Sequence, residues 1–263
     1  MQQPITRRIV LQLMAGLPFA AAAPAFARER PSIGRLIAQA SALPTAAERM
    51  AFISRGLLGV RYQANTLIGG PRRKEVFVVR ADAFDCVTFC EVVLAAALAR
   101  DLPAFETSLR RIRYQHGDVK WDERNHYFAD WSRRAVENNI CRPVAMEPSV
   151  TIEKTVNWRN LGKRQVSLSV VPRATLMANK DLLASGDVIG FVSRRPNLDF
   201  YHTGLVAFGK GGEVMLRHAS RSRGRVVDDR IDAFVAVNRV QYVTLVRAVN
   251  AIDPASGAFR TSS

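Results

Sequence analysis

Apolar residues follow a helical spacing in the first half of the chain and a strand-like spacing in the second. Five segments of the first half are predicted to be helices, because their apolar residues recur at helical spacing or fill the whole segment. They are 32–42, 45–58, 81–99, 102–114 and 130–139. The segment 81–99 is apolar on nearly every side, which is typical of a helix buried in the core. A polar and aromatic loop is predicted over 116–130.

Short runs rich in β-branched and aromatic residues predict strands in the second half: 150–156, 166–171, 187–192, 202–208, 213–218 and 240–246. A short helix is predicted over 172–183. Helices gathered in one half and strands in the other indicate an α+β fold rather than alternating β–α–β units. No internal linker divides the chain, so we predict a single domain over 28–263.

The first 27 residues have the composition of an export signal. They contain no acidic residue, and a largely apolar run follows Arg7-Arg8 and leads to Ala25-Phe26-Ala27, which fits a cleavage site. The paired arginines favour a twin-arginine signal, and an ordinary secretory signal is the alternative. The apolar run is too short to span a bilayer. We therefore expect no membrane span after signal cleavage, and a location in the periplasm or cell envelope.

The chain is strongly basic, with 38 Lys and Arg against 23 Asp and Glu and a formal net charge of +15. This balance suits a polyanionic partner. An exported protein meets peptidoglycan or anionic lipid rather than nucleic acid, and no nucleic-acid-binding motif is present. Three cysteines in 263 residues exclude a disulfide-dense scaffold, although export would allow Cys90 to pair with Cys141.

Cys86 lies at the start of the predicted buried helix, between Asp85 and Val87. The unpaired backbone N–H groups and the dipole at a helix N-terminus stabilise a thiolate, and the same groups can hold an oxyanion. The charge of Asp85 opposes the thiolate. These features favour a nucleophile, and the alternative is a small hydrophobic side chain packed in the core.

Two histidines lie on either side of a predicted turn at Gly209–Gly212. A three-residue loop would place His202 directly opposite His218, with both imidazoles on one face of the sheet. His202 would then accept the thiol proton while His218 held its ring in place. A different loop length would break this pairing and leave two unrelated strand histidines.

Four short motifs in order resemble the NlpC-type superfamily of papain-like cysteine peptidases and amidases of the bacterial cell wall. They are Asp85-Cys86, Ser185-Gly186-Asp187-Val188-Ile189, His202-Thr203-Gly204-Leu205 and His218-Ala219-Ser220. The resemblance implies that Cys86 is the nucleophile, His202 the base and His218 the orienting residue. It also implies a papain-like fold, in which the helical N-terminal half with the nucleophile helix packs on a mainly antiparallel sheet.

A closer resemblance is to the branch similar to N-acetylmuramoyl-L-alanine amidases, first catalogued as a domain of unknown function. It rests on Asp85-Cys86-Val87-Thr88-Phe89 with Glu91, and on Arg124-Asn125-His126-Tyr127 followed by Asp130-Trp131. The likeness covers most of 45–247.

Several residues are candidates for contacts with substrate. Tyr62 completes a Gly-x-x-Tyr element that the superfamily has shortly before its nucleophile. Here a long segment separates it from Cys86, and a core aromatic is the alternative. His126, Asp130 and Trp131 combine polar groups with an aromatic face that suits a sugar or peptide subsite, and a loop anchor is the alternative.

The remaining candidates are Asp85, beside the nucleophile, and Arg217. Arg217 and Arg221 flank His218 and could bind a stem-peptide carboxylate, while a solvated surface position is the alternative in so basic a chain. No His-Glu-x-x-His motif or closely spaced ligand set is present. We therefore expect neither a metal nor another cofactor.

These patterns predict an exported cysteine hydrolase that cleaves the amide between N-acetylmuramic acid and L-alanine in peptidoglycan or muropeptides. The alternatives are a stem-peptide endopeptidase of the same superfamily and a non-catalytic basic protein that binds peptidoglycan. The sugar–peptide amide is favoured because the insertion between Tyr62 and Cys86 and the segment 126–131 would add walls and aromatic surface for a sugar.

Overall fold

The computed structural model describes residues 32–157 and 161–250. The predicted export signal, 1–27, lies outside the described residues. Within the described ranges no helix is both long and apolar enough to cross a membrane.

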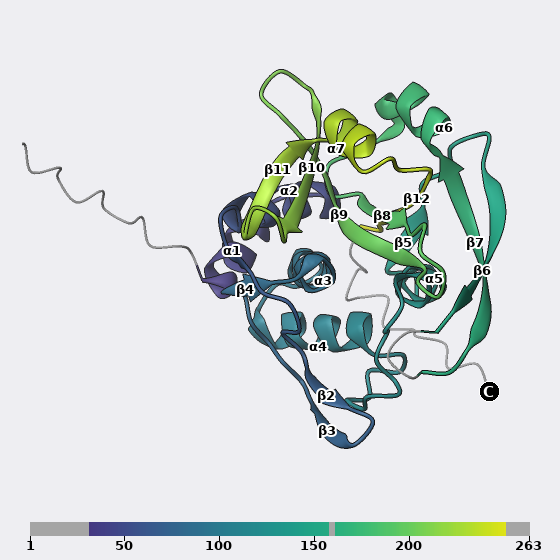
Figure 1. Ribbon diagram of the computed structural model, residues 1–263. Helices are drawn as coiled ribbons and strands as arrows, with labels where there is room; N and C mark the ends of the chain where they lie inside the picture. Colours follow the sequence, from purple (N-terminus) through teal and green to yellow (C-terminus); the bar gives the residue numbers. More distant parts are fainter. Residues whose placement is uncertain (1–31, 158–160, 251–263) are drawn as a thin grey trace, which may run out of the picture.

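The N-terminal part is helical. Its helices are α1 (Ile33–Ala40), α2 (Ala46–Gly56), α3 (Cys86–Ala97), α4 (Leu102–Arg113) and α5 (Phe128–Glu137). The first four begin where a Ser, Thr or Asp side chain accepts a hydrogen bond from the backbone of the first turn. Figure 1 shows α3 near the centre of the molecule, between α4 and the sheet. This position explains why α3 is apolar on nearly every side.

The other elements form a curled and mostly antiparallel sheet. Among the described residues its strand order is β4-β1-β11-β10-β9-β8-β12-β7-β6, with β5 paired to β12. β1 and β4 run parallel to each other, and the other neighbouring strands are antiparallel. The strands of this sheet are β1 (Arg61–Tyr62), β4 (Ala83–Phe84), β5 (Cys141–Pro143), β6 (Val150–Val156), β7 (Arg164–Pro172), β8 (Val188–Val192), β9 (Phe200–Phe208), β10 (Val214–Ser220), β11 (Arg225–Arg230) and β12 (Tyr242–Ala248).

Three smaller features complete the fold. β2 (Ile68–Gly70) and β3 (Arg73–Val76) form a separate hairpin. α6 (Arg173–Ala178) follows β7 and leads to a short 3-10 turn, and α7 (Ile231–Val237) follows β11. The architecture is therefore α+β, with a helical N-terminal part packed on a mostly antiparallel sheet.

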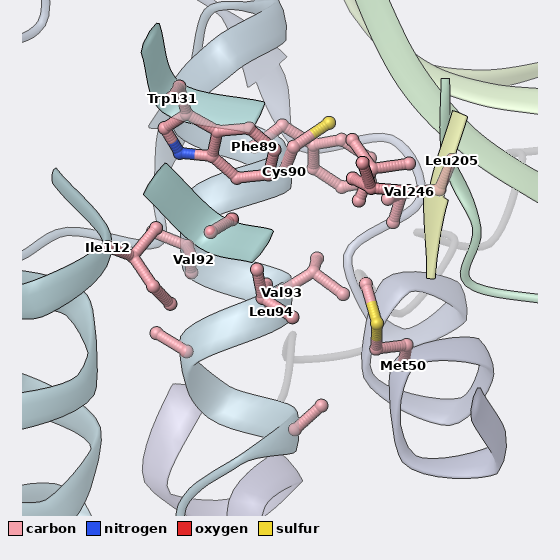
Figure 2. Close-up of a cluster of buried hydrophobic side chains, with 14 of the residues drawn as sticks. Met50, Phe89, Cys90, Val92, Val93, Leu94, Ile112, Trp131, Leu205 and Val246 are labelled. Atoms are coloured by element: carbon pink, nitrogen blue, oxygen red, sulfur yellow. The ribbon is translucent and has the colours of Figure 1, made fainter. Parts of the chain in front are cut away.

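Each face of the sheet has its own apolar core. On one face Phe89 and Cys90 of α3 lie toward Leu205 of β9, as Figure 2 shows. On the other face Phe234 of α7 packs on Phe191 of β8, with ring centres 4.7 Å apart. Residues that alternate along β8, β9 and β10 therefore serve two different cores.

Two buried ion pairs fasten the surroundings of α3. Arg113 of α4 donates to Glu91 of α3 at 2.9 Å, and Arg124 donates to Glu75 of β3 at 2.8 Å. All four side chains are nearly inaccessible to solvent, so each charge depends on its partner. The first pair ties α4 to α3, and the second ties the loop after α4 to the β2–β3 hairpin.

Most predicted elements are present with shifted ends, but some elements were not predicted. The predicted helix 81–99 is β4 followed by α3, because the Asp85 cap starts the helix at Cys86. The pattern predicted neither β1 nor β11. β11 is rich in Arg and Asp, and Val226 is its one buried residue. It is stabilised by pairing with β10 rather than by apolar content.

Candidate active site

Cys86 is the first residue of α3, and the helix cap fixes its position. The Asp85 carboxylate accepts a hydrogen bond from the Thr88 N–H at 2.8 Å, and the Asp85 N–H donates to the Thr88 hydroxyl at 3.0 Å. This reciprocal cap sets the first turn of the helix. The thiol therefore stands at the helix N-terminus, as the sequence predicted.

The environment of the thiol favours its neutral form. Burial, with a contribution from the Asp85 carboxylate, raises the pKa of Cys86 to about 12. The backbone N–H groups of Thr203, Cys86 and Val87 point at the sulfur and act in the opposite direction, but they are outweighed. Of the two opposing influences that the sequence indicated here, the helix N-terminus and the charge of Asp85, the second prevails together with burial. The resting thiol needs a base.

β9 and β10 form the predicted hairpin, but with a different register. Leu205 pairs with Arg217, because the turn is longer than three residues. The predicted direct pairing of His202 with His218 is therefore wrong by two residues, and the register continues to place His218 opposite Gly204. A shift of two residues keeps both histidines on the same face. A side chain at Gly204 would lie 2.9 Å from the His218 Cβ, so glycine leaves the room that His218 needs.

The two imidazoles meet and continue to a carboxylate. His202 Nε2 lies 2.6 Å from His218 Nδ1, and His218 Nε2 lies 3.1 Å from Oδ2 of Asp229 on β11. An ionised carboxylate only accepts, so His218 carries its proton on Nε2 and accepts at Nδ1. His202 then donates from Nε2, and its Nδ1 is unprotonated. No described residue forms a hydrogen bond with this Nδ1, so it is ready to accept a proton.

Both imidazoles are held neutral. Burial, with a smaller contribution from His218, lowers the pKa of His202 to about 3. Burial also lowers the pKa of His218, and Asp229 opposes that shift. The rings of Phe191 and Phe234 lie 6.2 Å and 5.5 Å from the His202 ring centre and help to exclude water. A neutral imidazole with a free nitrogen is the form that a general base requires.

Thr203 links the two halves of the site. Its hydroxyl lies 3.8 Å from the sulfur of Cys90, so its side chain faces α3, and its backbone N–H points at Cys86. His202, one residue earlier, faces the other side of the sheet. The β9–β10 ladder ends just before this point. The first turn of α3 thus lies beside the backbone of β9 at Thr203, the residue next to His202.

Tyr62 of β1 lies close to the thiol. β1 pairs with β4, which places Tyr62 opposite Phe84, two residues before Cys86. Burial raises the pKa of Tyr62, the charges of Cys86 and Asp85 add to this, and Arg221 opposes it. The long segment between Tyr62 and the nucleophile is the β2–β3 hairpin, after which the chain returns beside β1.

Two cavities flank this centre. The histidine cavity, about 830 Å³, is lined by both histidines, Asp229, the β10–β11 turn and α7. The helix-cap cavity, about 180 Å³, is lined by Asp85 and Val87, which flank Cys86, and by His126. One cavity is therefore lined by the histidine pair and the other by the residues on either side of Cys86.

The AmiA-like family, described as N-acetylmuramoyl-L-alanine amidase-like, matches residues 52–240, a range that holds Cys86, His202, His218 and Asp229. The chain belongs to this family. The match confirms the resemblance to the amidase-like branch. No curated protein matches the chain.

Solved structures share this fold, and one of them supports the family assignment. A crystal structure of an N-acetylmuramoyl-L-alanine amidase from Bacteroides uniformis is 25% identical, with a TM-score of 0.69 over 78% of this chain and 99% of the other. A Legionella pneumophila protein of family DUF1460 is 21% identical, with a TM-score of 0.72 over 84% of this chain and 94% of the other. The second likeness concerns the fold alone.

Two other residues that were predicted to contact substrate line cavities. His126 lines the helix-cap cavity, and its Nε2 lies 2.6 Å from the Trp121 backbone oxygen. Asp130 of α5 forms ion pairs with Arg164 and Arg133 and lines a separate groove between α5 and β7. The structure thus brings His126, but not Asp130, toward the first turn of α3.

Two further predicted contacts are inside the protein. Trp131 is 2% exposed and stacks on Phe128, because the face of α5 that carries both rings turns toward the core. Arg217 is 3% exposed and donates to both carboxylate oxygens of Asp228 at 2.7 Å. It adjoins His218 in sequence and so faces the opposite side of the sheet. Neither side chain has surface to offer a substrate, contrary to the sequence-based expectation.

Asp229 is the member of the site that the sequence pattern missed. It lies on β11, which the pattern did not predict, and pairs in register near His218. Asp228 and Asp229 face opposite sides, so that one meets Arg217 and the other His218. A turn after His218 followed by two adjacent carboxylates was the available signal.

The structure also bears on the possible Cys90–Cys141 disulfide and on metal binding. All three cysteines are unpaired, so Cys90 and Cys141 form no disulfide. Burial raises the pKa of Cys141 to about 12 and also raises the pKa of Cys90. Over 32–157 and 161–250 no group of three or more His, Cys, Asp or Glu is placed to hold a metal ion.

Proposed function

We propose that the protein is an exported, papain-like cysteine amidase that cleaves the bond between N-acetylmuramic acid and L-alanine in peptidoglycan or muropeptides. The mechanism rests on the hydrogen-bonded series His202–His218–Asp229, which leaves His202 Nδ1 without a partner among the described residues, one position before Thr203, whose backbone N–H points at Cys86. Family membership supports the substrate class. The basic charge of the chain suits an anionic wall polymer.

The reaction begins from a neutral thiol and a neutral imidazole. As the sulfur of Cys86 attacks the lactyl carbonyl carbon, His202 Nδ1 takes the thiol proton, so no free thiolate accumulates. The developing oxyanion is stabilised by backbone N–H groups of the first turn of α3. His202 then gives its proton to the L-alanine nitrogen, the carbon–nitrogen bond breaks, and the peptide leaves. Water, activated by the same imidazole, hydrolyses the thioester and restores the thiol.

The same centre would attack a stem-peptide bond by the same steps, so an endopeptidase is the second candidate. Membership of the amidase-like family favours the sugar–peptide amide, and polar side chains of the helix-cap cavity, among them Asn125 and His126, suit hydrogen bonds to part of a sugar. A non-catalytic wall-binding protein would leave the ordered imidazoles without a role.

Thiol reagents test the mechanism. Iodoacetamide is expected to inactivate the protein with an adduct that maps to Cys86, which is half-buried, whereas Cys90 and Cys141 are fully buried and serve as internal controls. EDTA is expected to leave activity unchanged. Loss of activity in EDTA that zinc restores, without dependence on Cys86, would move the protein to the metal-dependent hydrolases.

Asp229 is expected to act as a positioning residue through His218. Asp229→Ala should lower kcat by about 10- to 100-fold with little change in KM, because both rings lose the partner that fixes their tautomers. Asp229→Asn keeps an oxygen that accepts from His218 Nε2, so it should recover part of the loss. Steady-state kinetics on a defined muropeptide would measure this. Equal activity of wild type and Asp229→Ala would remove Asp229 from the site.

A further inference from the structure

The histidine cavity is rich in arginine. Arg221, Arg223 and Arg230 line it, from the β10–β11 turn and the end of β11, against the single carboxylate of Asp229. Its volume of about 830 Å³ lies within the range of cavities that bind small ligands. The cavity is therefore large enough for a short peptide, and its rim is positively charged.

The guanidinium groups of this rim are open to a ligand. Within the described residues Arg221 forms no side-chain hydrogen bond or ion pair. Arg223 lies 3.6 Å from Asp229, and Arg230 lies 3.5 Å from Asp232, and both arginines are 63% exposed. Ion pairs that are this long and this exposed contribute little to stability, so a ligand can displace them. A planar guanidinium with unused N–H groups binds a carboxylate through two parallel hydrogen bonds.

The chemistry of the proposed reaction decides which part of the substrate reaches this cavity. The group that protonates the leaving nitrogen must lie on the leaving-group side of the bond. His202 performs that step and lines the histidine cavity. If the proposed function holds, the released peptide therefore lies in the histidine cavity, and the acyl side lies toward the helix-cap cavity. The peptide stem is the anionic part, since its D-glutamyl residue and its C-terminus carry carboxylates.

We infer that the histidine cavity is a carboxylate-recognising subsite for the peptide stem, with Arg221 as the principal determinant. Arg221 is chosen because it lines the cavity and, unlike Arg223 and Arg230, has no ion-pair partner among the described residues. Of the two arginines that the sequence offered for this task, Arg217 is internal. Arg221, four residues further on, takes that role at the surface.

Direct binding to an inactive protein tests the subsite without turnover. The probe is L-alanyl-D-glutamyl peptide, compared with the same peptide amidated at the free D-glutamyl carboxylate, and titrated calorimetrically into Cys86→Ala. Arg221→Gln in this background should weaken binding of the acidic peptide about ten-fold, the loss of one charge-assisted pair. The amidated peptide should bind weakly to both proteins. Arg72→Gln is the matched control, because Arg72 is an exposed arginine in the β2–β3 turn, far from α7 in Figure 1.

The outcomes separate this inference from the proposed function. Equal affinity of Cys86→Ala for the acidic and amidated peptides, or no effect of Arg221→Gln, overturns the subsite even if the wild type cleaves muropeptides. Selective loss in Arg221→Gln, but not in Arg72→Gln, supports it. Steady-state kinetics provide a second test. Arg221→Gln should raise KM about ten-fold for a substrate with an acidic stem and leave kcat nearly unchanged.

Discussion

Cys86→Ala is expected to lower kcat/KM on a defined muropeptide by on the order of 10⁴-fold or more, because no other group at the helix N-terminus can form the acyl intermediate. Cys86→Ser should be nearly as inactive, since a serine hydroxyl in this site is a far weaker nucleophile than the thiol. The side chain is small and half-buried, so both variants should fold and melt close to the wild type.

The other cysteines provide matched controls for this prediction. Cys90→Ala, one helical turn further along α3, and Cys141→Ala in β5 remove thiols that are fully buried. Both should keep most of the activity while losing some stability to the small cavities that they create. Near-normal turnover by Cys86→Ala would contradict the nucleophile assignment.

His202→Ala is expected to be almost as damaging. With the pKa of Cys86 raised to about 12, hardly any thiolate exists at neutral pH unless a base removes the proton. The residual activity of His202→Ala should therefore rise with pH, by about ten-fold per unit, as the thiolate fraction grows below that pKa. The wild type, which transfers the proton to His202 during attack, should not share this slope.

Substitutions of His218 should be less damaging, because His218 orients the His202 ring and does not itself take up the thiol proton. His218→Gln and His218→Asn retain an acceptor and a donor and should keep part of the activity that His218→Ala loses. Circular dichroism would establish that each variant is folded. Full activity of His218→Ala would remove it from the series, and a flat pH profile in His202→Ala would contradict the role of His202 as base.

Much of the fold was readable from local pattern. The all-apolar segment around α3 indicated a buried helix, and runs rich in β-branched and aromatic residues indicated β8, β9, β10 and β12 within one or two residues. β11 escaped because its stability comes from its neighbours, β10 and β1, and its sequence of Arg and Asp has no apolar alternation. Pairing between distant segments is not encoded in the period of either one.

The site likewise combines features that local sequence predicts with features that depend on the fold. Cys86 near the start of a buried helix was a local feature that the pattern indicated, whereas the cap formed by Asp85 and Thr88, which moves the start of the helix from 81 to 86, was not predicted. The contact between His202 and His218 survived a wrong register only because the error was an even number of residues. Asp229, Trp131 and Arg217 depend on which face of an element meets the core. For Arg217 and His218, one step along a strand separates the protein interior from the histidine cavity.

The identity of the cleaved bond tests the account most directly. A muropeptide of known structure is incubated with the wild type and with Cys86→Ala, and the product masses are measured. We expect the wild type, and not Cys86→Ala, to release a free amino sugar and an intact stem peptide that begins with L-alanine. A sugar that still carries L-alanyl-D-glutamate, or the same products from both proteins, would contradict it.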